Sequence, residues 1–387
     1  MSDNMSGNWN YPTSIRFGEG RISELPDACR ELGMKRPLLV TDRGLAEMSI
    51  VKDAIEQNII AGLPTGLFSD VQGNPTGENV FDGISALKEG AYDGVIAFGG
   101  GSALDVGKAI ALAAHQSGVL WDFEDVGDNW LRVDELKCLP VVAVPTTSGT
   151  GSEVGRCSVI VESDSHRKVL IFHPSVMPKK VICDPELTLG LPAGLTAAVG
   201  MDALSHNLEG LCSPGYHPQA IGIAMEGIRL IHKSLEIAVS DGSNVEARAD
   251  LLMASLMGAT AFQNGLGAMH AMAHPIGAVL NAHHGLINAI VMPYVLRHNK
   301  EAIEEKMARL GRYLDLDDPS FEGVLGWVLS IRESIGIPNT LRAIGVNEDN
   351  IEQLAVQAAK DPSGGTNPIP LTVSSLRGLL RESMEGV

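Results

Sequence analysis

The chain has 387 residues, which at roughly 150 residues per domain predicts about two domains. Lysine and arginine number 29 against 47 aspartates and glutamates, and the resulting net charge of −18 disfavours nucleic acids and anionic membrane surfaces as partners. A hydrophobic share of 44% with 43 glycines excludes a disordered chain and is typical of a globular α/β or α-rich enzyme.

Short apolar runs recur between helical patterns from residue 36 to about residue 185. Their β-branched content and their Gly, Pro or Asp borders are typical of buried parallel strands. The predicted strands are 37–41, 94–98, 140–144 and 180–183. Apolar residues at helical spacing predict helices over 44–58, 76–89 and 105–116. We therefore expect a doubly wound α/β sheet in this half of the chain.

Beyond Pro192 the strand signal fades and long helical patterns follow. The predicted helices are 194–211, 218–240, 244–263 and 301–314. Residues 361–368 have the composition of a loop. The expected organisation is an α/β nucleotide-binding domain over 1–187 and an all-helical domain over 188–387.

Three glycines and a serine at 99–102 separate a predicted strand from an Ala-rich helix. Backbone N–H groups at the start of a helix stabilise an anion, so this loop predicts a phosphate site. The loop does not match G-x-G-x-x-G, because Leu104 occupies the place of the third glycine, and it is not a P-loop. The alternative interpretation is a tight turn with no ligand.

Two further polar features follow predicted strands. Residues 145–153 offer hydroxyl groups at the same carboxyl edge of the sheet, where α/β proteins bind ligands. Asp42 ends the first predicted strand, where a carboxylate can bind a ribose diol and repel a 2′-phosphate. This position favours NAD over NADP, and the alternative is that Asp42 only caps a helix.

Histidines concentrate in the helical half, with seven of the eleven between residues 206 and 284. Asp202 and His206 are four residues apart, as are His270 and His274, so each pair lies on one face of its predicted helix. A straight helix would separate His270 from His284 by about 21 Å, so one site requires a bend between them.

Carboxylate and imidazole ligands without thiolate suit Fe²⁺, Zn²⁺, Co²⁺ or Mn²⁺, and we predict a divalent metal site from this cluster. No H-E-x-x-H motif occurs, so a zincin protease is not indicated. The alternative is that each histidine is a polar core residue bonded to a backbone carbonyl.

Five cysteines are spread along the chain without a C-x-x-C pair, which predicts neither a disulfide framework nor a thiolate zinc site. The cytoplasm is therefore the expected compartment. Residues 1–8 lack the basic and apolar regions of a signal peptide, and no stretch has about 18 uninterrupted apolar residues. We expect neither export by that route nor a membrane-spanning segment.

Taken in order, these motifs resemble those of the iron-containing (group III) alcohol dehydrogenase family, which includes lactaldehyde reductase, 1,3-propanediol dehydrogenase and butanol dehydrogenases. The matching segments are 17–20, 99–102, 145–150, 200–206, 273–277 and 283–285. The resemblance extends over nearly the whole chain. It implies the dehydroquinate synthase-like fold, with an α/β nucleotide-binding domain, an all-α metal-binding domain and a cleft between them for NAD(P) and the metal.

The resemblance also implies roles for individual residues. The implied metal ligands are Asp202, His206, His270 and His284, with Fe²⁺ as the metal and Zn²⁺ as the alternative. His274 matches a histidine near the nicotinamide, which implies a role in proton transfer. The implied cofactor contacts are Asp42, Asn74, Gly100, Gly101, Ser102, Thr146, Thr147, Thr150 and Lys168.

Two positions depart from the family's pattern. Gly73 stands where the family usually has proline, and Cys157 stands where some relatives carry an asparagine that touches the cofactor.

The expected activity is reversible, NAD-linked oxidation of a primary alcohol or diol to an aldehyde. A Lewis-acid metal favours the alkoxide, or polarises the carbonyl in the reverse direction, while the nicotinamide exchanges hydride. The expected partners are a small alcohol or aldehyde and, from the resemblance alone, a second copy of the chain in a homodimer or larger assembly.

Three alternatives use the same residues. A glycerol- or polyol-type dehydrogenase shares the architecture, although a phosphorylated substrate would call for Lys or Arg, which 201–211 and 270–291 lack. A metal-dependent hydrolase without nicotinamide could use the same four ligands around a water molecule, but it has no use for the glycine loop. A catalytically silent metal- or nucleotide-binding protein would not need the intact ligand set.

Overall fold

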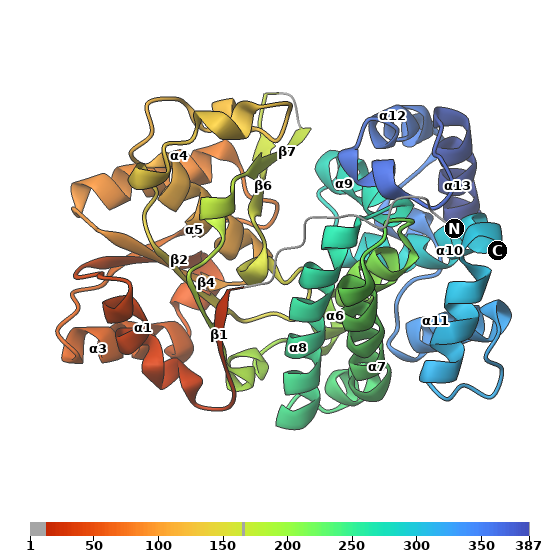
Figure 1. The fold of residues 1–387 in the computed structure, drawn as a ribbon, viewed down its shortest axis with the longest axis horizontal. Coiled ribbons are helices and arrows are strands. Elements are labelled where there is room, and N and C mark those ends of the chain that lie inside the picture. Colours follow the sequence, from red (N-terminus) through yellow and green to blue (C-terminus); the bar gives the residue numbers. More distant parts are fainter. Residues whose placement is uncertain (1–12, 165–166, 387) are drawn as a thin grey trace. The chain divides into compact units, whose positions relative to one another are not determined.

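The computed structural model describes residues 13–164 and 167–386, which divide into two compact units. Of these residues, an α/β unit takes 13–147 and 151–190, and a helical unit takes 148–150 and 191–386. In Figure 1 the α/β unit runs from red to yellow-green and the helical unit from green to blue.

A six-stranded parallel sheet, ordered β1-β8-β5-β4-β2-β3, forms the centre of the α/β unit. Its strands are β1 (Ser14–Phe17), β2 (Pro37–Asp42), β3 (Gly66–Val71), β4 (Gly94–Gly99), β5 (Val141–Pro145) and β8 (Lys180–Cys183). The four predicted strands are confirmed as β2, β4, β5 and β8. The edge strands β1 and β3 escaped prediction because their side chains are partly exposed and form no continuous apolar run.

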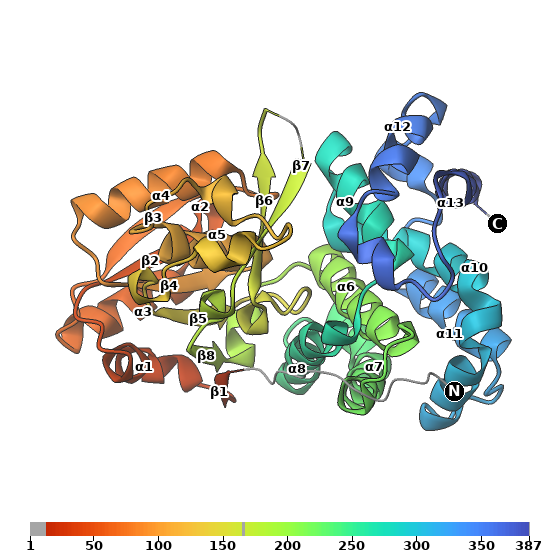
Figure 2. The same cartoon turned by 45° about the horizontal axis from the view of Figure 1, so that its top comes forward.

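Helices cover both faces of this sheet (Figure 2). They are α1 (Leu25–Glu31), α2 (Arg43–Ala46), α3 (Ser49–Ile60), α4 (Gly77–Glu89) and α5 (Gly101–Ala113). Leu25, Val51 and Ile96 belong to the core between the sheet, α1 and α3. On the opposite face α5 lies so close to β4 that a Cβ atom at Gly107 would be 2.7 Å from the Cβ of Ala97.

The prediction of one helix over 44–58 is wrong, because two helices occupy this segment. Met48, between α2 and α3, has extended backbone (ψ 152°), so the helical hydrogen bonds cannot continue through it. Apolar residues keep their helical spacing from α2 into α3, so the periodicity of the sequence alone did not reveal the break at Met48.

The antiparallel pair β6 (Cys157–Glu162) and β7 (Arg167–Phe172) stands apart from the main sheet. It is joined to the unit through Lys108 on α5. The Lys108 ammonium is fully buried and donates to the Cys157 carbonyl (2.6 Å) and to the Ser152 hydroxyl (2.6 Å). The neighbouring Asp105 lies 3.1 Å from the same ammonium and accepts from the Val159 N–H (2.9 Å). These contacts fix the 152–159 segment against α5.

The described residues of the helical unit form helices and connecting segments but no strand, as predicted. The helices are α6 (Ala193–Cys212), α7 (Pro218–Ser240), α8 (Val245–Ala261), α9 (Ala268–Leu280), α10 (His284–Tyr313), α11 (Phe321–Ser334), α12 (Glu348–Ala358) and α13 (Val373–Glu385). The expected bend between His270 and His284 is present: α9 ends at Leu280, the next residue, Asn281, has a left-handed φ of +51°, and α10 begins at His284. The helix predicted over 301–314 is therefore only the second half of α10.

Residues 361–368 contain a short 3-10 helix, Pro362–Thr366, so the expectation of a simple loop there is wrong. Asp361 caps this helix by accepting from the Ser363 N–H (2.9 Å). The proline and glycines that suggested a loop are compatible with a single tight turn of helix.

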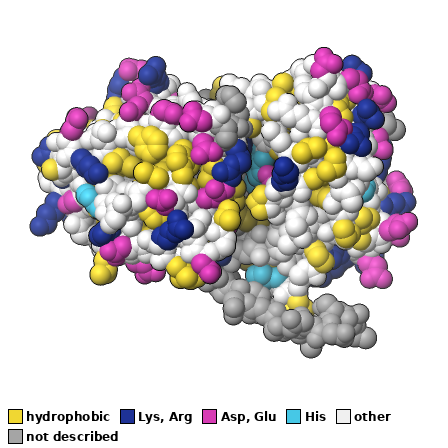
Figure 3. Space-filling model, turned by 90° about the horizontal axis from the view of Figure 1, so that it is seen from above, with side chains coloured by type: hydrophobic (Ala, Val, Ile, Leu, Met, Phe, Trp, Pro, Cys, Tyr) yellow, Lys and Arg dark blue, Asp and Glu magenta, His cyan; other side chains and the backbone are white. Residues whose placement is uncertain are grey.

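No described helix combines the length and the apolar character needed to cross a membrane. On the face of the molecule in Figure 3, acidic side chains are interspersed with lysines and arginines. The described residues on that face therefore form no extended basic surface of the kind that binds nucleic acid.

Candidate functional site

Three helices of the helical unit bring the four predicted metal ligands together. Asp202 and His206 lie on α6, His270 lies on α9, and His284 is the first residue of α10. Ligand atoms of the first three residues all lie within 4.8 Å of one another, and His284 Nε2 is 3.7 Å from Asp202 Oδ1. Ligands about 2.0–2.2 Å from a tetrahedral metal would be roughly 3.3–3.6 Å apart, so small side-chain adjustments would satisfy such an ion.

The two buried histidines present unprotonated nitrogens to each other. His206 Nδ1 lies 2.8 Å from the Asp202 carbonyl and His270 Nδ1 lies 2.6 Å from Glu209 Oε2, and both partners are acceptors only. Each Nδ1 therefore carries the proton when the ring is neutral, which leaves a lone pair on each Nε2. These Nε2 atoms are 2.9 Å apart, so a proton or a metal ion has to relieve the repulsion between them.

The charges around this pair favour a cation. In the described part of the chain, Asp202, Glu209 and Asp361 form ion pairs only with histidines and with no Lys or Arg. Burial opposes a charge on His270, but the carboxylates of Glu209, Asp202 and Asp361 raise its pKa above the ordinary value. Burial and the neighbouring His270 lower the pKa of His206 to about 4. The residues present therefore fit a divalent metal ion by donor type, by geometry and by charge.

Two neighbouring side chains hold the Asp202 carboxylate. Thr150 Oγ1 donates to Asp202 Oδ2 (3.3 Å), and Asn288 Nδ2 donates to Oδ1 (2.9 Å). The Asn288 amide also lies 3.1 Å from His284 Nε2, so its N–H groups point among the ligand atoms. Thr150, expected as a cofactor contact, therefore lies at the metal cluster in this structure.

A glycine allows α10 to approach α6 closely enough to complete this cluster. A Cβ atom at Gly285 would be 2.3 Å from the Ala198 carbonyl oxygen and 2.9 Å from the Asp202 Cβ. Any larger residue would push the first turn of α10, and His284 with it, away from Asp202.

His274 lies one turn beyond His270 on α9 and has a different partner. Its Nδ1 is 2.8 Å from Asp361 Oδ2, which orients the ring and leaves Nε2 to accept a proton. Burial opposes ionisation of Asp361, but the neighbouring His274 holds the pKa of this carboxyl below its usual value. The His274 ring also stacks on His284, with ring centroids 5.3 Å apart. His274 is therefore beside the metal cluster but directed by a carboxylate of its own.

In the α/β unit, the glycine loop joins β4 to α5. β4 ends at Gly99 and α5 begins at Gly101, and no described side chain caps the first N–H groups of α5. The next loop lies against it, since the Thr146 N–H donates to the Gly99 carbonyl (3.0 Å) and a Cβ at Gly100 would be 3.3 Å from Thr147 Cγ2. Bare backbone amides at the start of a long helix are a favourable environment for a pyrophosphate.

Two of the remaining expected cofactor residues, Asp42 and Asn74, end or follow strands of the main sheet, whereas Lys168 lies on the separate β6–β7 pair. β2 and β4 are neighbours at the point where the strand order reverses, so Asp42 ends the strand beside the glycine loop. Asp42 Oδ1 accepts from the Leu45 N–H (3.0 Å), so the capping interpretation is correct for one carboxylate oxygen. Asn74, with a left-handed φ of +52°, follows β3. Lys168 lies on β7, opposite Val161.

Cys157, one of the two departures from the family's pattern, begins β6 and is half-buried, and desolvation raises the pKa of its thiol.

The structure also reveals polar residues that the sequence did not single out. Glu209 and Asn288 contact His270 and His284, and Asp361 contacts His274. Glu209 follows His206 by three residues and Asn288 follows His284 by four, so helical spacing could have indicated both. Asp361 is 87 residues from His274, and no local pattern could have linked them.

Family models match both halves of the chain. The model described as iron-containing alcohol dehydrogenase covers residues 12–185, and the model for the C-terminal part of the Fe-containing alcohol dehydrogenase family covers residues 196–384.

Similar proteins carry the names of dehydrogenases and oxidoreductases. A 4-hydroxybutyrate dehydrogenase of Cupriavidus necator is 39% identical over 97% of this chain and 99% of its own length. An NAD-dependent methanol dehydrogenase of Bacillus methanolicus is 32% identical over 97% of this chain and 100% of its own. The crystal structure of a 1,3-propanediol oxidoreductase superposes with a TM-score of 0.92 at 34% identity, covering 97% of this chain and 99% of that one.

Proposed function

The chain belongs to the iron-containing alcohol dehydrogenase family, and from that premise we propose a metal-dependent, NAD-linked dehydrogenase that interconverts a primary alcohol or diol and its aldehyde. The observation that carries the proposal is the pair of histidine Nε2 atoms 2.9 Å apart, beside two buried carboxylates with no Lys or Arg partner. Such a site is built for a cation.

The metal would be held by Asp202, His206, His270 and His284. When bound, a divalent ion supplies a Lewis acid that favours the alkoxide over the alcohol. The chain's part is to fix the ligands. The Asp202 carbonyl and Glu209 hold the two imidazoles in the tautomer that presents Nε2, while Thr150 and Asn288 hold the Asp202 carboxylate.

We assign proton transfer to His274. Asp361 accepts the Nδ1 proton, so Nε2 has the lone pair that can take the proton released during alcohol oxidation. The carboxylate then stabilises the imidazolium that results, and in the reverse direction the same Nε2 returns the proton to the developing alkoxide. Asp361 thereby acts as a positioning residue for His274.

For the cofactor, the first turn of α5 would bind the pyrophosphate through Gly100, Gly101 and Ser102, with Thr146, Thr147, Asn74 and Lys168 contributing contacts around it. The free oxygen of Asp42 would accept from the adenosine ribose, which selects NAD over NADP. The name of the methanol dehydrogenase relative, NAD-dependent, supports the same choice.

The 4-hydroxybutyrate and 1,3-propanediol relatives support a substrate whose reacting hydroxyl is primary. We place the enzyme in the cytoplasm because all five cysteines are free thiols, which is typical of proteins from reducing compartments. We also propose a homodimer or larger homo-oligomer, as most soluble oligomeric enzymes are symmetric assemblies of one chain.

The test is anaerobic turnover of the Fe²⁺-loaded protein with NAD⁺ and a panel of primary alcohols and diols, followed as NADH absorbance. The control is the same protein after removal of metal by a chelator. NADH formation that needs the metal supports the proposal. Silence with every alcohol, with NADP⁺ and with aldehydes plus NADH would contradict it and favour the hydrolase alternative.

A further inference from the structure

Glu209 is a buried carboxylate whose contacts lead directly to a metal-site histidine. It lies on α6, one turn beyond His206, and only 5% of the residue is exposed. Its Oε2 atom is 2.6 Å from His270 Nδ1, and its Oε1 atom accepts from the Met269 N–H (2.7 Å). The two oxygens therefore contact two successive residues at the start of α9, one residue each.

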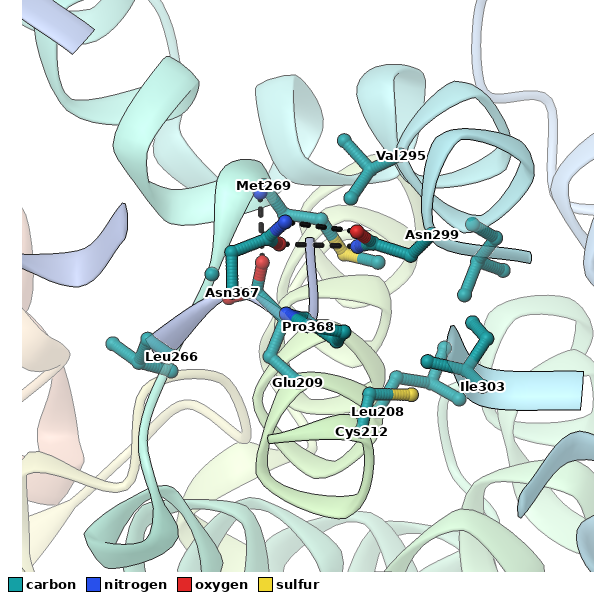
Figure 4. A pocket seen from close by; sticks show the side chains of 12 residues that line it. Leu208, Glu209, Cys212, Leu266, Met269, Val295, Asn299, Ile303, Asn367 and Pro368 are labelled. Carbon is teal, nitrogen blue, oxygen red and sulfur yellow. Dashed lines mark hydrogen bonds between the residues drawn. The ribbon is translucent and has the colours of Figure 1, made fainter. Parts of the chain in front are cut away.

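Among the described residues, no Lys or Arg forms an ion pair with the Glu209 carboxylate. Its one ion pair in the described structure is with His270. The small cavity beside it, drawn in Figure 4, has a volume of about 10 Å³ and a mostly apolar lining, so it is too small for a substrate. An ionised carboxylate is costly to bury unless a positive charge compensates it, and the nearby metal site is where that charge would be.

The first turn of α9 is held by a second, independent contact. Asn367 Oδ1 accepts from the Ala268 N–H (3.0 Å), and Asn367 forms a reciprocal amide pair with Asn299, at 2.8 and 3.0 Å. Figure 4 shows this amide pair next to the contact between Glu209 and the Met269 N–H. Anchoring of the helix end is therefore shared, whereas Glu209 is the one described residue that contacts His270 Nδ1.

We infer that Glu209 is an outer-shell carboxylate of the metal site, which fixes His270 with its proton on Nδ1 and supplies the second negative charge that offsets a divalent ion. Together with Asp202 it supplies two negative charges against the two positive charges of a divalent ion. Glu209 acts through His270 and is a positioning residue. This inference rests on the metal site of the proposed function.

The substitution Glu209→Gln separates this role from a merely structural one. The glutamine keeps the size and an acceptor, but its NH₂ group would face either His270 Nδ1–H or the Met269 N–H, both of which are donors. His270 can escape the conflict by moving its proton to Nε2, where it would donate to His206 Nε2. That bond stabilises the metal-free protein and blocks the position that the metal needs.

The experiment measures Zn²⁺ affinity by competition with a chromophoric chelator, and the melting temperature with and without Zn²⁺. For Glu209→Gln we expect the dissociation constant to rise 10–100-fold, the loss typical of removing an outer-shell partner, while the melting temperature without metal is not lowered. The matched control, Asn299→Ala, breaks the amide pair that anchors the same helix. We expect the control to lower the melting temperature but to change the Zn²⁺ dissociation constant by no more than about threefold.

Two results would overturn the inference: an unchanged dissociation constant in Glu209→Gln, or equal losses of affinity in Glu209→Gln and Asn299→Ala. Failure of the wild-type protein itself to bind Zn²⁺ would instead contradict the proposed function. If Glu209→Gln does not fold, ¹⁵N spectra of the histidines in Zn²⁺-loaded wild-type protein decide the matter. We expect a protonated Nδ1 at His270, and an unprotonated Nδ1 would overturn the inference.

Discussion

The two units build their candidate sites in opposite ways. In the α/β unit the site lies at consecutive strand ends, and its main donors are backbone N–H groups at the start of α5. In the helical unit the site is made of side chains from α6, α9 and α10, each fixed by another buried side chain or carbonyl. A backbone site needs correct local folding, whereas a side-chain site needs distant helices to meet within tenths of an ångström.

This difference predicts where single substitutions do most damage. Removing one side chain at the glycine loop leaves its N–H donors in place, because the backbone supplies them. In the helical unit, replacing one ligand residue or one closely packed glycine changes the number or the positions of the metal ligands.

Replacing either of two histidines on α9 should separate metal binding from turnover. We expect His270→Ala to lose bound metal and with it all metal-dependent activity. We expect His274→Ala to keep the metal but to lose about 10²–10⁴-fold in kcat, the usual contribution of a proton-transfer group. Metal analysis of the purified variants, together with NADH-coupled kinetics, measures both effects. Equal metal loss in the two variants would make His274 a ligand and refute this assignment.

One buried carboxylate of the α/β unit should make the free energy of unfolding depend on pH. Glu153 in the α/β unit is completely buried, burial raises its pKa to about 7, and its Oε1 atom has no hydrogen-bond partner in the described structure. In the unfolded chain Glu153 ionises near the ordinary pKa of 4.5, whereas in the folded protein it keeps its proton up to about pH 7. The free energy of unfolding therefore falls as the pH rises from about 4.5 to about 7. The loss should be on the order of 3 kcal/mol, at about 1.4 kcal/mol per pKa unit.

Glu153→Gln removes this titration. Urea unfolding at pH 4.5 and at pH 8 should show a smaller fall in stability for the variant than for the wild type. Glu89→Gln, on the exposed side of α4, is the control and should behave like the wild type. If the pH dependence of Glu153→Gln matches that of the wild type, Glu153 does not hold its proton in the folded protein.

Gly285→Ala tests how closely α10 must approach α6. The new methyl group would lie 2.3 Å from the Ala198 carbonyl oxygen, so the helix has to shift, at a cost of about 1–3 kcal/mol in stability. His284 would move with it, and we expect weaker metal binding as well as a lower melting temperature. Gly326→Ala on α11 is the matched control, because a Cβ atom there meets nothing within 4 Å. We expect this control to be neutral or stabilising by up to about 1 kcal/mol, and weaker metal binding in Gly285→Ala alone would support the packing argument.

The same contrast explains how much the sequence could predict. Strand–loop–helix patterns are local, so β4, the glycine loop and α5 could be predicted directly from residues 94–113. The edge strand β3 was missed because its alternating exposure resembles that of a surface segment. The break at Met48 was missed because it depends on backbone conformation rather than on apolar spacing.

In the helical unit, spacing placed Asp202 with His206 and His270 with His274, but it could not show which helices meet. Glu209 has the right spacing from His206, yet an acidic residue on a helix usually faces water, and only the packing of α9 against α6 buries it. The composition of residues 361–368 placed Asp361 in a loop, and no local pattern could link it to His274, 87 residues away. Local patterns thus predicted the strand, loop and helix that would form the backbone site, but only some of the side chains in the helical cluster.

The smallest effect that we predict concerns Asp42, where the sequence left two interpretations open. Its carboxylate caps α2, and one oxygen remains for a ribose. Asp42→Gly removes both functions, whereas Asp42→Asn keeps the cap and removes only the charge that would repel a 2′-phosphate. We expect both variants to lower the ratio of kcat/KM for NAD⁺ to that for NADP⁺ by about tenfold, the size of one close like-charge interaction at the surface. A change in Asp42→Gly alone would mean that the cap, rather than the charge, shapes the cofactor site. An unchanged ratio in both would leave Asp42 with no role beyond starting a helix.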